Sequence, residues 1–575
     1  MPRAADGAVL GLPELLAWLA ARCGLPLLHI DPLQVDVAQL AEVMSERYAA
    51  RHGVLPVQVT ATEVVVATAE PYATRWVPDI ERQTRRRVRL VLANPLDVAR
   101  YTAEFYTLAQ FVRQAQKDGA PAAVGASFEQ WVEPGASGGG PALDANDKSV
   151  VQVVDWLWQY AFDQRASDIH LEPRREQGIV RFRIDGVLHR VYQLPLPVMA
   201  AVVARIKLLG RMDVVEKRRP LDGRIKTRRL RGDAPGEAGG EVEMRLSTLP
   251  TAFGEKMVMR IFDPQASART LDALGFSPDD AARWRRLIAR PHGIVLVTGP
   301  TGSGKTTTLY ATLRQLATEA VNVSTIEDPI EMIEPAFNQT QVQPQLDLDF
   351  AAGLRALMRQ DPDVIMVGEI RDLPTAEMAV QAALTGHLVF ATLHTNDAPS
   401  AITRLLELGV APYLINATVQ GVLAQRLVRT LCPHCKTLAH EPAQARVRRL
   451  LAEAGEPPVA GPAGEAAVHR PQGCAHCRMT GYRGRLGLYE LLEVGDVLQA
   501  RIGPQAVLDD LRRQARREGM RPLRVAGLQA VLRGWTTLEE VAAATPDAPL
   551  APGNHPHDDS LKVATQPGGF GEARA

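Results

Sequence analysis

The length, composition and charge of the chain exclude several classes of protein. Its 575 residues are too many for one hydrophobic core, so we expect three or four domains. The chain is 46% hydrophobic and 23% charged, and its 65 Lys and Arg balance its 65 Asp and Glu, which is typical of a soluble globular protein and gives no sign of a nucleic-acid binder.

No segment of the sequence reads as a membrane span or a signal peptide. The most apolar candidate near the N-terminus is interrupted by Glu14 and Arg22, and it lacks a basic leader and a cleavage site. We therefore expect a cytosolic protein.

The first unit, residues 1–112, has the pattern of a small α+β domain. Helical spacing over Leu12 to Ala21 is followed by strand-like segments at Leu55–Val59, Glu63–Ala69 and Val88–Val91. Residues 113–147 are rich in Gly, Ala, Pro and Ser, which predicts a flexible linker.

The rest of the chain divides into further units. Residues 148–265 start with an amphipathic helix from Ser149 and continue with strands at Gly178–Ile184, Val187–Tyr192 and Glu241–Leu246, with a polar hairpin loop over Leu230 to Gly240. Strands and helices alternate over 270–431, which predicts a parallel α/β sheet. We expect a cysteine-bearing insertion at 432–480, a helical region at 481–544 and a disordered tail at 545–575.

A phosphate-binding loop is the strongest motif in the sequence. A buried strand, Ile294–Val297, leads into a G-x-x-x-x-G-K-T run and then a helix. Glycines let the backbone N–H groups point at phosphate oxygens, and the helix N-terminus adds a positive dipole end. We expect Lys305 to bridge the β- and γ-phosphates of ATP and Thr306 to ligate Mg²⁺. The predicted nucleotide-binding residues are Gly299, Pro300, Thr301, Gly302, Ser303, Gly304, Lys305, Thr306 and Thr307.

Acidic residues follow two further predicted strands. Val321–Ile326 ends in Glu327, and Val364–Val367 is followed by Gly368 and Glu369. Carboxylates at the carboxyl ends of parallel strands lie beside the phosphate site, where they can hold Mg²⁺ or activate water. Because the usual Asp of the second strand is absent, we assign Glu369 to the metal and Glu327 to the water. The alternative is that both acids cap helices.

Two histidines flank the next predicted strand. His387 precedes it and His394 follows it, in the run Thr385–Asn396. His394 is placed to contact the γ-phosphate, although a lone histidine is more often structural.

Four cysteines form two C-x-x-C pairs. Cys432 and Cys435 are separated by 38 residues from Cys474 and Cys477. In a reducing compartment such pairs favour one structural tetrahedral Zn²⁺ over disulfides. A redox pair and idle cysteines remain the alternatives.

Several longer runs resemble one family. Met358–Asp372, Thr325–Glu331 and Thr385–Asn396 look like the signature, the Asp box and the His box of the type II/type IV secretion ATPases. Ala166–Pro173 and Arg218–Arg224 resemble the family's second N-terminal domain. The likeness covers about 148–540 and is greatest to the GspE/PilB-like branch, which also carries the four cysteines.

The resemblance implies a fold and a working arrangement. The fold is multidomain α/β and α+β: a RecA-like P-loop NTPase core, a PAS-like second N-terminal domain, a small α+β N-terminal domain and a tetracysteine zinc subdomain. ATP would bind between the second N-terminal domain and the core, in a hexameric ring that works on an inner-membrane platform protein. Arg245 and Arg260, with Arg224 behind them, are the candidates for phosphate contacts supplied by a neighbouring subunit; a surface salt bridge is the alternative for each.

Residues 1–112 resemble the domain that docks such ATPases on the membrane platform. Some relatives bind cyclic-di-GMP through an Arg-Leu-Gly motif, but Val9 precedes Leu10 and Gly11 here, which makes docking the better hypothesis.

Three functions are compatible with these features. The first is a cytoplasmic ATPase motor, peripheral on the inner membrane through its partners, for type II secretion or pilus assembly, with a slight preference for secretion; a DNA-uptake motor of the same family stays open. The second is a nucleic-acid motor on a RecA-like core, which the neutral charge and 5% aromatic content disfavour. The third is a nucleotide-bound scaffold without turnover.

Overall fold

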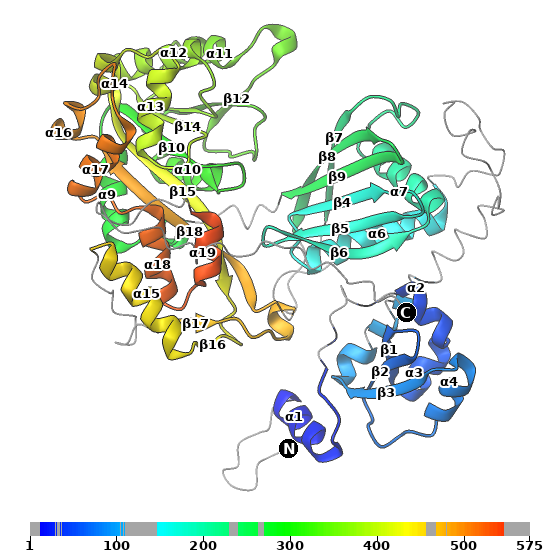
Figure 1. The fold of residues 1–575 in the computed structure, drawn as a ribbon. Helices are drawn as coiled ribbons and strands as arrows, with labels where there is room; N and C mark the ends of the chain where they lie inside the picture. Colours follow the sequence, from blue (N-terminus) through cyan, green and yellow to red (C-terminus); the bar gives the residue numbers. More distant parts are fainter. Residues whose placement is uncertain are drawn as a thin grey trace.

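The structure, a computed structural model, describes most of the chain (Figure 1). It covers residues 12–109 except 29, 31–34, 36, 100, 104, 107 and 108, then 146–228, 240–262, 270–455 and 467–545 except 479. Most of the predicted linker, the predicted hairpin loop and the predicted tail lie outside these residues. Within them, no helix is both long enough and apolar enough to cross a membrane.

The first unit is a three-stranded sheet with short helices. Strands β1 and β2 are antiparallel, and β2 and β3 are parallel. The strands agree with the predicted segments to within a residue or two. The elements are α1 (Leu12–Cys23), α2 (Val37–Val43), α3 (Glu46–His52), β1 (Val54–Val59), β2 (Glu63–Thr68), α4 (Val77–Thr84) and β3 (Arg87–Leu92).

The second unit is a six-stranded antiparallel sheet in the order β6-β5-β4-β9-β8-β7. Buried and half-buried residues alternate along β5, as expected when one face of a strand packs on a core. Helices α6 and α7 contact each other and cover that face (Figure 1). The elements are α6 (Lys148–Asp163), β4 (Asp168–Pro173), β5 (Gly178–Ile184), β6 (Val187–Leu194), α7 (Leu196–Leu209), β7 (Leu221–Arg228), β8 (Glu241–Thr251) and β9 (Gly254–Phe262).

The third unit is built on a seven-stranded sheet in the order β12-β11-β13-β14-β10-β15-β18. The first six strands are parallel, and β18 runs antiparallel to β15. Strands β10, β11, β13 and β14 are buried throughout, and all but β11 read in the sequence as mostly apolar runs. The strands are β10 (Gly293–Thr298), β11 (Val323–Glu327), β12 (Asn338–Gln341), β13 (Val364–Val367), β14 (Leu388–Leu393), β15 (Val419–Leu431) and β18 (Tyr482–Glu493).

Helices cover both faces of this sheet, so the parallel α/β expectation is met. They are α9 (Pro278–Ile288), α10 (Lys305–Leu316), α11 (Phe350–Leu357), α12 (Leu373–Leu384), α13 (Pro399–Glu407) and α14 (Pro412–Thr418). Short 3₁₀ turns lie at Leu271–Leu274, Pro344–Leu346 and Ala475–Cys477.

The expectation of a purely helical region at 481–544 is wrong at its start. Tyr482–Glu493 forms β18, which pairs along most of its length with β15 and completes the sheet. Its second half is buried, so its leucines pack as strand residues rather than on a helix face. The remaining elements are β16 (Thr437–Leu438), α15 (Glu441–Glu453), β17 (His469–Arg470), α16 (Asp496–Gln499), α17 (Leu508–Arg517), α18 (Leu523–Leu532) and α19 (Leu538–Ala544).

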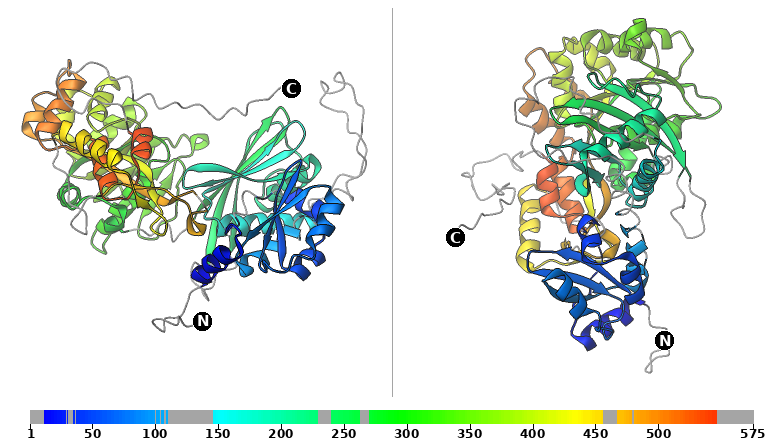
Figure 2. Two further views of the ribbon diagram at one scale, coloured as in Figure 1. Left: turned by 60° about the horizontal axis from the view of Figure 1, so that its bottom comes forward. Right: turned by 90° about the vertical axis from the view of Figure 1, so that its right-hand side faces the viewer.

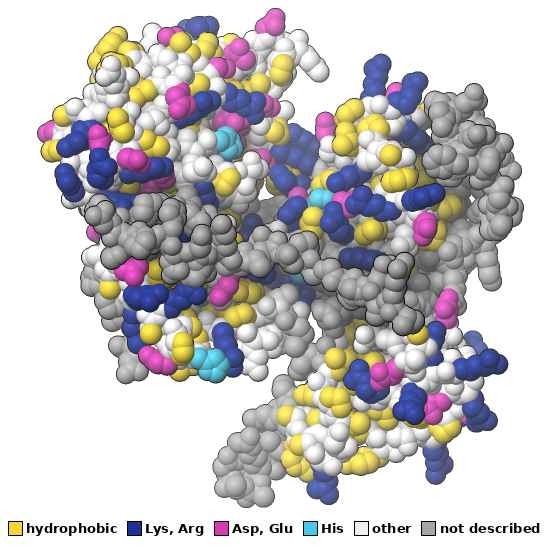
Figure 3. Space-filling view, in the orientation of Figure 1, with side chains coloured by type: hydrophobic (Ala, Val, Ile, Leu, Met, Phe, Trp, Pro, Cys, Tyr) yellow, Lys and Arg dark blue, Asp and Glu magenta, His cyan; other side chains and the backbone are white. Residues whose placement is uncertain are grey.

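The three larger sheets belong to different units, seen from two further sides in Figure 2, and a small two-stranded sheet pairs β16 with β17. Lys and Arg side chains gather between the six-stranded and seven-stranded units in the space-filling view (Figure 3). The carboxyl ends of the core strands and the basic side chains of the second unit meet there.

Candidate nucleotide site

The phosphate-binding loop joins the end of β10 to the start of α10, as the motif predicts. Gly299 has a φ of 149°, and a Cβ there would lie 2.5 Å from the backbone oxygen of Gln425. Only glycine fits this turn. The N-terminus of α10 therefore opens toward the loop, with Thr306 and Thr307 exposed in its first turn.

Lys305 lies folded against its own loop. Its Nζ donates to the carbonyl oxygens of Gly299 at 2.7 Å and Pro300 at 3.2 Å. Burial lowers the pKa of Lys305 from 10.5 to about 8, so the ammonium form still dominates at neutral pH. Within the described residues, the buried hydroxyl of Ser303 has no hydrogen-bond partner, which suits a loop built to receive a polar ligand.

A cleft of about 590 Å³ opens in front of this loop, a size typical of small-molecule sites. It brings together the loop, both predicted acids and a predicted arginine. The predicted residues on its wall are Thr301, Gly302, Ser303, Gly304, Lys305, Thr306, Thr307, Glu327, Glu369, His394 and Arg260. Gly299 and Pro300 do not line the cleft; they accept hydrogen bonds from Lys305.

Glu327 is the last residue of β11, and only 3% of it is exposed. One carboxylate oxygen accepts from the Tyr310 hydroxyl at 2.7 Å, and the other from the Thr325 hydroxyl at 2.7 Å and the Gln339 amide at 3.2 Å. This carboxylate is thus held in one orientation from three sides.

Glu369 follows β13 and contacts two basic side chains. Arg371 forms an ion pair with one carboxylate oxygen of Glu369, and His394 Nε2 lies 3.5 Å from the other oxygen. The hydrogen bond to Glu369 raises the pKa of Arg371 above its usual range. Glu369 therefore lies in the wall of the cleft with His394 beside it.

The two predicted histidines lie at opposite ends of β14. His394 follows the strand and faces the cleft; burial and then the charge of Lys305 lower its pKa, which favours the neutral imidazole. His387 precedes the strand, and its Nδ1 bonds the carbonyl of Ala382 at 2.8 Å. Six strand residues, roughly 20 Å of chain, separate the two rings, so only His394 lies at the cleft.

The predicted arginines come from β7, β8 and β9 of the second unit. Arg260 lines the cleft, and its Nε donates to Asp168 at 3.0 Å. Arg245 does not line the cleft; it bonds the carbonyl of Ile330 and pairs with Glu331 at 3.2 Å. Arg224 lies further out, 3.4 Å from the Gln341 amide oxygen. These contacts are within one chain, so Arg260 reaches the cleft without a neighbouring subunit.

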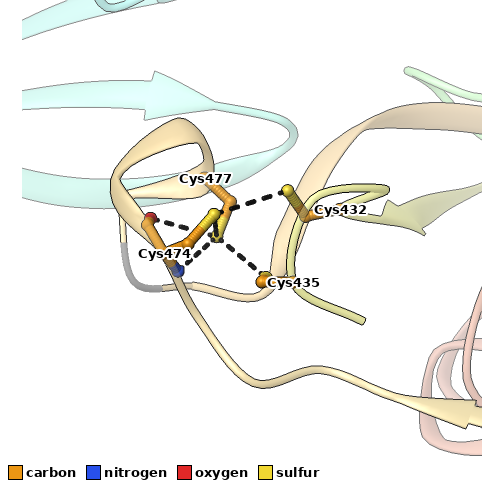
Figure 4. A group of neighbouring side chains, drawn as sticks. All are labelled: Cys432, Cys435, Cys474 and Cys477. Atoms are coloured by element: carbon orange, nitrogen blue, oxygen red, sulfur yellow. Dashed lines mark hydrogen bonds between the residues drawn. The ribbon is translucent and has the colours of Figure 1, made fainter. Parts of the chain in front are cut away.

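The four predicted metal-binding cysteines form a compact cluster (Figure 4). All four sulfur atoms lie within 4.8 Å of one another, with separations of 3.8 Å for Cys432 to Cys474 and 3.7 Å for Cys435 to Cys477. Four thiolates at about 2.3 Å from a tetrahedral Zn²⁺ have sulfur atoms about 3.8 Å apart. The donor set and its geometry therefore fit Zn²⁺, and Cys477 Sγ also accepts from backbone N–H groups.

Sequence reasoning missed several residues of the cleft. Tyr310 and Arg485 line its wall, and Arg371 does so although it was assigned no role. Arg426 is 7% exposed and bonds the carbonyl of Asn396, beside the His394 loop. Tyr310 lies five residues after Lys305 on α10, so its position on the phosphate-loop helix was the available signal.

Comparisons with known proteins point to one group of relatives. The sequence matches the family described as "Type II/IV secretion system protein" over residues 144–543 and the "MshEN domain" over residues 23–110. It is 51% identical over 534 residues to the "Type IV pilus assembly ATPase TfpB" of Acinetobacter baylyi, covering 93% of this chain and 88% of that protein. It is 47% identical over 400 residues to the "Type II secretion system protein E" of Pseudomonas aeruginosa, covering 70% of this chain and 76% of that protein.

Among solved structures, the Yersinia pseudotuberculosis ATPase DotB aligns with a TM-score of 0.51 at 21% identity, over 70% of this chain and 95% of that one. At this identity the likeness shows a shared fold.

Proposed function

Because the chain belongs to the type II/IV secretion system protein family, we propose that it is the ATPase motor that assembles a type IV pilus. Its reaction is that of the family, hydrolysis of ATP to ADP and phosphate. The pilus-assembly relative aligns with 93% of this chain, whereas the type II secretion relative aligns with 70%. Because 534 of the 575 residues align with the pilus-assembly relative, the alignment must include most of residues 1–112. We therefore prefer pilus assembly to type II secretion, which the sequence alone slightly favoured.

The observation that carries the proposal is the convergence of the Lys305 loop with two acids in one cleft. The loop would hold the phosphates through its N–H groups and Lys305, with Arg260 facing them from the second unit. Thr306 and Glu369 would hold Mg²⁺, which neutralises phosphate charge when bound.

The two acids are proposed to divide the work. Glu327 is held by Tyr310 and Thr325, so its free lone pairs have a fixed direction. It would orient and deprotonate the attacking water, while Glu369 serves the metal. Neutral His394 would contact the γ-phosphate as a hydrogen-bond partner, next to Glu369.

We propose that the cysteine cluster holds one structural Zn²⁺. Cys432 N donates to the carbonyl of Gly481, and Leu431 N donates to that of Trp535. The cluster thus joins the end of β15 to the segment before β18 and to the C-terminal helices. All four ligand positions are thiolates, so the metal has no open position and no catalytic role is assigned to it.

The wider arrangement follows from the family. We propose a homo-oligomer, a hexamer, in the cytoplasm, bound to an inner-membrane platform protein through the domain of residues 1–112. The PAS-like description of the second unit stays a prediction, supported by its antiparallel sheet with helices on one face.

The test pairs enzymology with a cellular readout. Phosphate release by the purified oligomer should be lost in the Lys305→Ala variant, and a deletion strain carrying that variant should lack surface pili while type II secretion continues. A protein with no phosphate release above the Lys305→Ala control refutes the ATPase motor. Intact pili with lost secretion would favour the second candidate, a type II secretion motor, which the 47% identity over 400 residues supports.

A further inference from the structure

Tyr310 is a buried residue of the cleft that lies outside the phosphate-loop motif. It lies on α10, the helix that starts at Lys305, and is 1% exposed. Its hydroxyl lies 2.7 Å from Glu327 Oε2, 3.1 Å from the carbonyl of Met332 and 2.9 Å from the amide nitrogen of Gln339.

The donors and acceptors in this group fix the direction of the bond. A phenol has one proton to donate, and the Glu327 carboxylate is its shortest contact. Gln339, on the edge strand β12, donates to both the Tyr310 oxygen and Glu327 Oε1. The phenol oxygen accepts from the amide and gives its proton to the acid, so the chain of bonds has one consistent direction.

Electrostatics keep the phenol protonated. Burial, followed by the charge of Glu327, raises the pKa of Tyr310 above its ordinary value of 10. The hydroxyl is therefore a permanent donor over the working pH range.

We propose that Tyr310 is the positioning residue of Glu327: it ties the acid to the phosphate-loop helix and fixes which lone pair faces the cleft. This rests on the proposed role of Glu327 in water activation. The consequence is that one helix, α10, positions two parts of the site: Lys305 at the phosphates and Glu327 through its hydrogen bond with Tyr310.

The test is the Tyr310→Phe variant of the full chain, because phenylalanine keeps the ring and its packing against Phe337. We expect kcat to fall about 10- to 100-fold, the range for one hydrogen bond to a charged group, with little change in KM. A purely structural role would instead lower the midpoint of urea unfolding and change kcat and KM together.

Tyr489→Phe is the matched control. Tyr489 is buried in the same hydrophobic cluster as Tyr310, and its hydroxyl donates to the backbone carbonyl of Leu274 at 2.9 Å. It does not line the cleft, so its variant should keep the wild-type kcat. An equal loss of kcat in both variants would overturn the proposal.

A double-mutant cycle separates this proposal from the one on which it rests. If Tyr310 acts through Glu327, Tyr310→Phe should slow the Glu327→Gln variant no further, and additive losses would refute this. If Glu327→Gln itself leaves kcat unchanged, the water-activation role fails instead. Binding of a fluorescent ATP analogue should be lost in Lys305→Ala and kept in Tyr310→Phe; its loss in Tyr310→Phe would overturn the positioning role.

Discussion

Replacing Gly368 by alanine tests whether the spacing of β11 and β13 sets the geometry of the two acids. Gly368 lies between β13 and Glu369, where the usual strand would carry Asp. A Cβ at this position would lie 3.2 Å from the carbonyl oxygen of Ile326 and 3.3 Å from the Cα of Glu327. Both are backbone atoms of β11, and Gly368 N donates to that same carbonyl at 2.8 Å. The strands can therefore separate only by weakening this bond.

The structure gives the size of the effect. Relief of such contacts needs a displacement of a few tenths of an ångström, and overpacking of this kind costs about 1–3 kcal/mol of folding stability. Since a misplacement of about 1 Å can cost about 100-fold in rate, we expect kcat of Gly368→Ala to fall about fivefold to tenfold.

The measurement is phosphate release together with urea unfolding of the same samples. Gly503→Ala is the control, because a Cβ there would meet no atom within 4 Å and its φ is not positive. A Gly368→Ala protein that keeps the wild-type kcat and unfolding midpoint would refute the claim that β11–β13 spacing controls the acids.

Three further predictions follow from single contacts. Because a neutral amine cannot offset phosphate charge, kcat/KM should be level below pH 8 and fall above it, where Lys305 with its pKa of about 8 loses its proton; a level profile to pH 9.5 would contradict this. Elemental analysis should find about one Zn²⁺ per wild-type chain and much less in the Cys477→Ser variant, which should also unfold at a lower urea concentration. The Cys23→Ser variant, whose change lies outside the cluster, should keep its Zn²⁺ and its unfolding midpoint. Arg245→Gln and Glu331→Gln should each lower kcat, and the double variant should be no slower than the slower single variant; additive losses would show that the pair does not act as a unit.

The sequence predicted what depends on short-range pattern. The strand and helix around Lys305 follow from a buried apolar run and a glycine-rich turn, and β13 and β5 have the predicted bounds. The proximity of the four cysteines was also predictable, because two C-x-x-C pairs can together supply the four ligands of one tetrahedral metal site whatever sequence lies between them.

Contacts between distant segments could not be predicted in this way. His387 and His394 share one motif in the sequence, yet they lie at opposite ends of β14. β18 was missed because an antiparallel edge strand with one exposed half has no continuous apolar run. Tyr310 was missed because it lies on α10 while its partner Glu327 lies on β11, and hydrogen bonds between distant elements leave no local pattern in the sequence.

The short segment from Glu327 to Glu331 links chemistry to the position of the second unit. Its first residue is held by Tyr310, from the phosphate-loop helix, and its last by Arg245, from β8 of the six-stranded sheet. Gln341, at the end of β12, accepts hydrogen bonds from both Ile330 in this segment and Arg224 in the second unit. A rotation of the second unit would pull on residues 330 and 331, only three or four positions from the acid proposed to activate water. Because the other end of the segment is fixed to the helix of Lys305, such a pull changes the geometry at the phosphates rather than being absorbed by a free loop. This is a physical route by which ATP turnover and domain movement can be coupled in both directions.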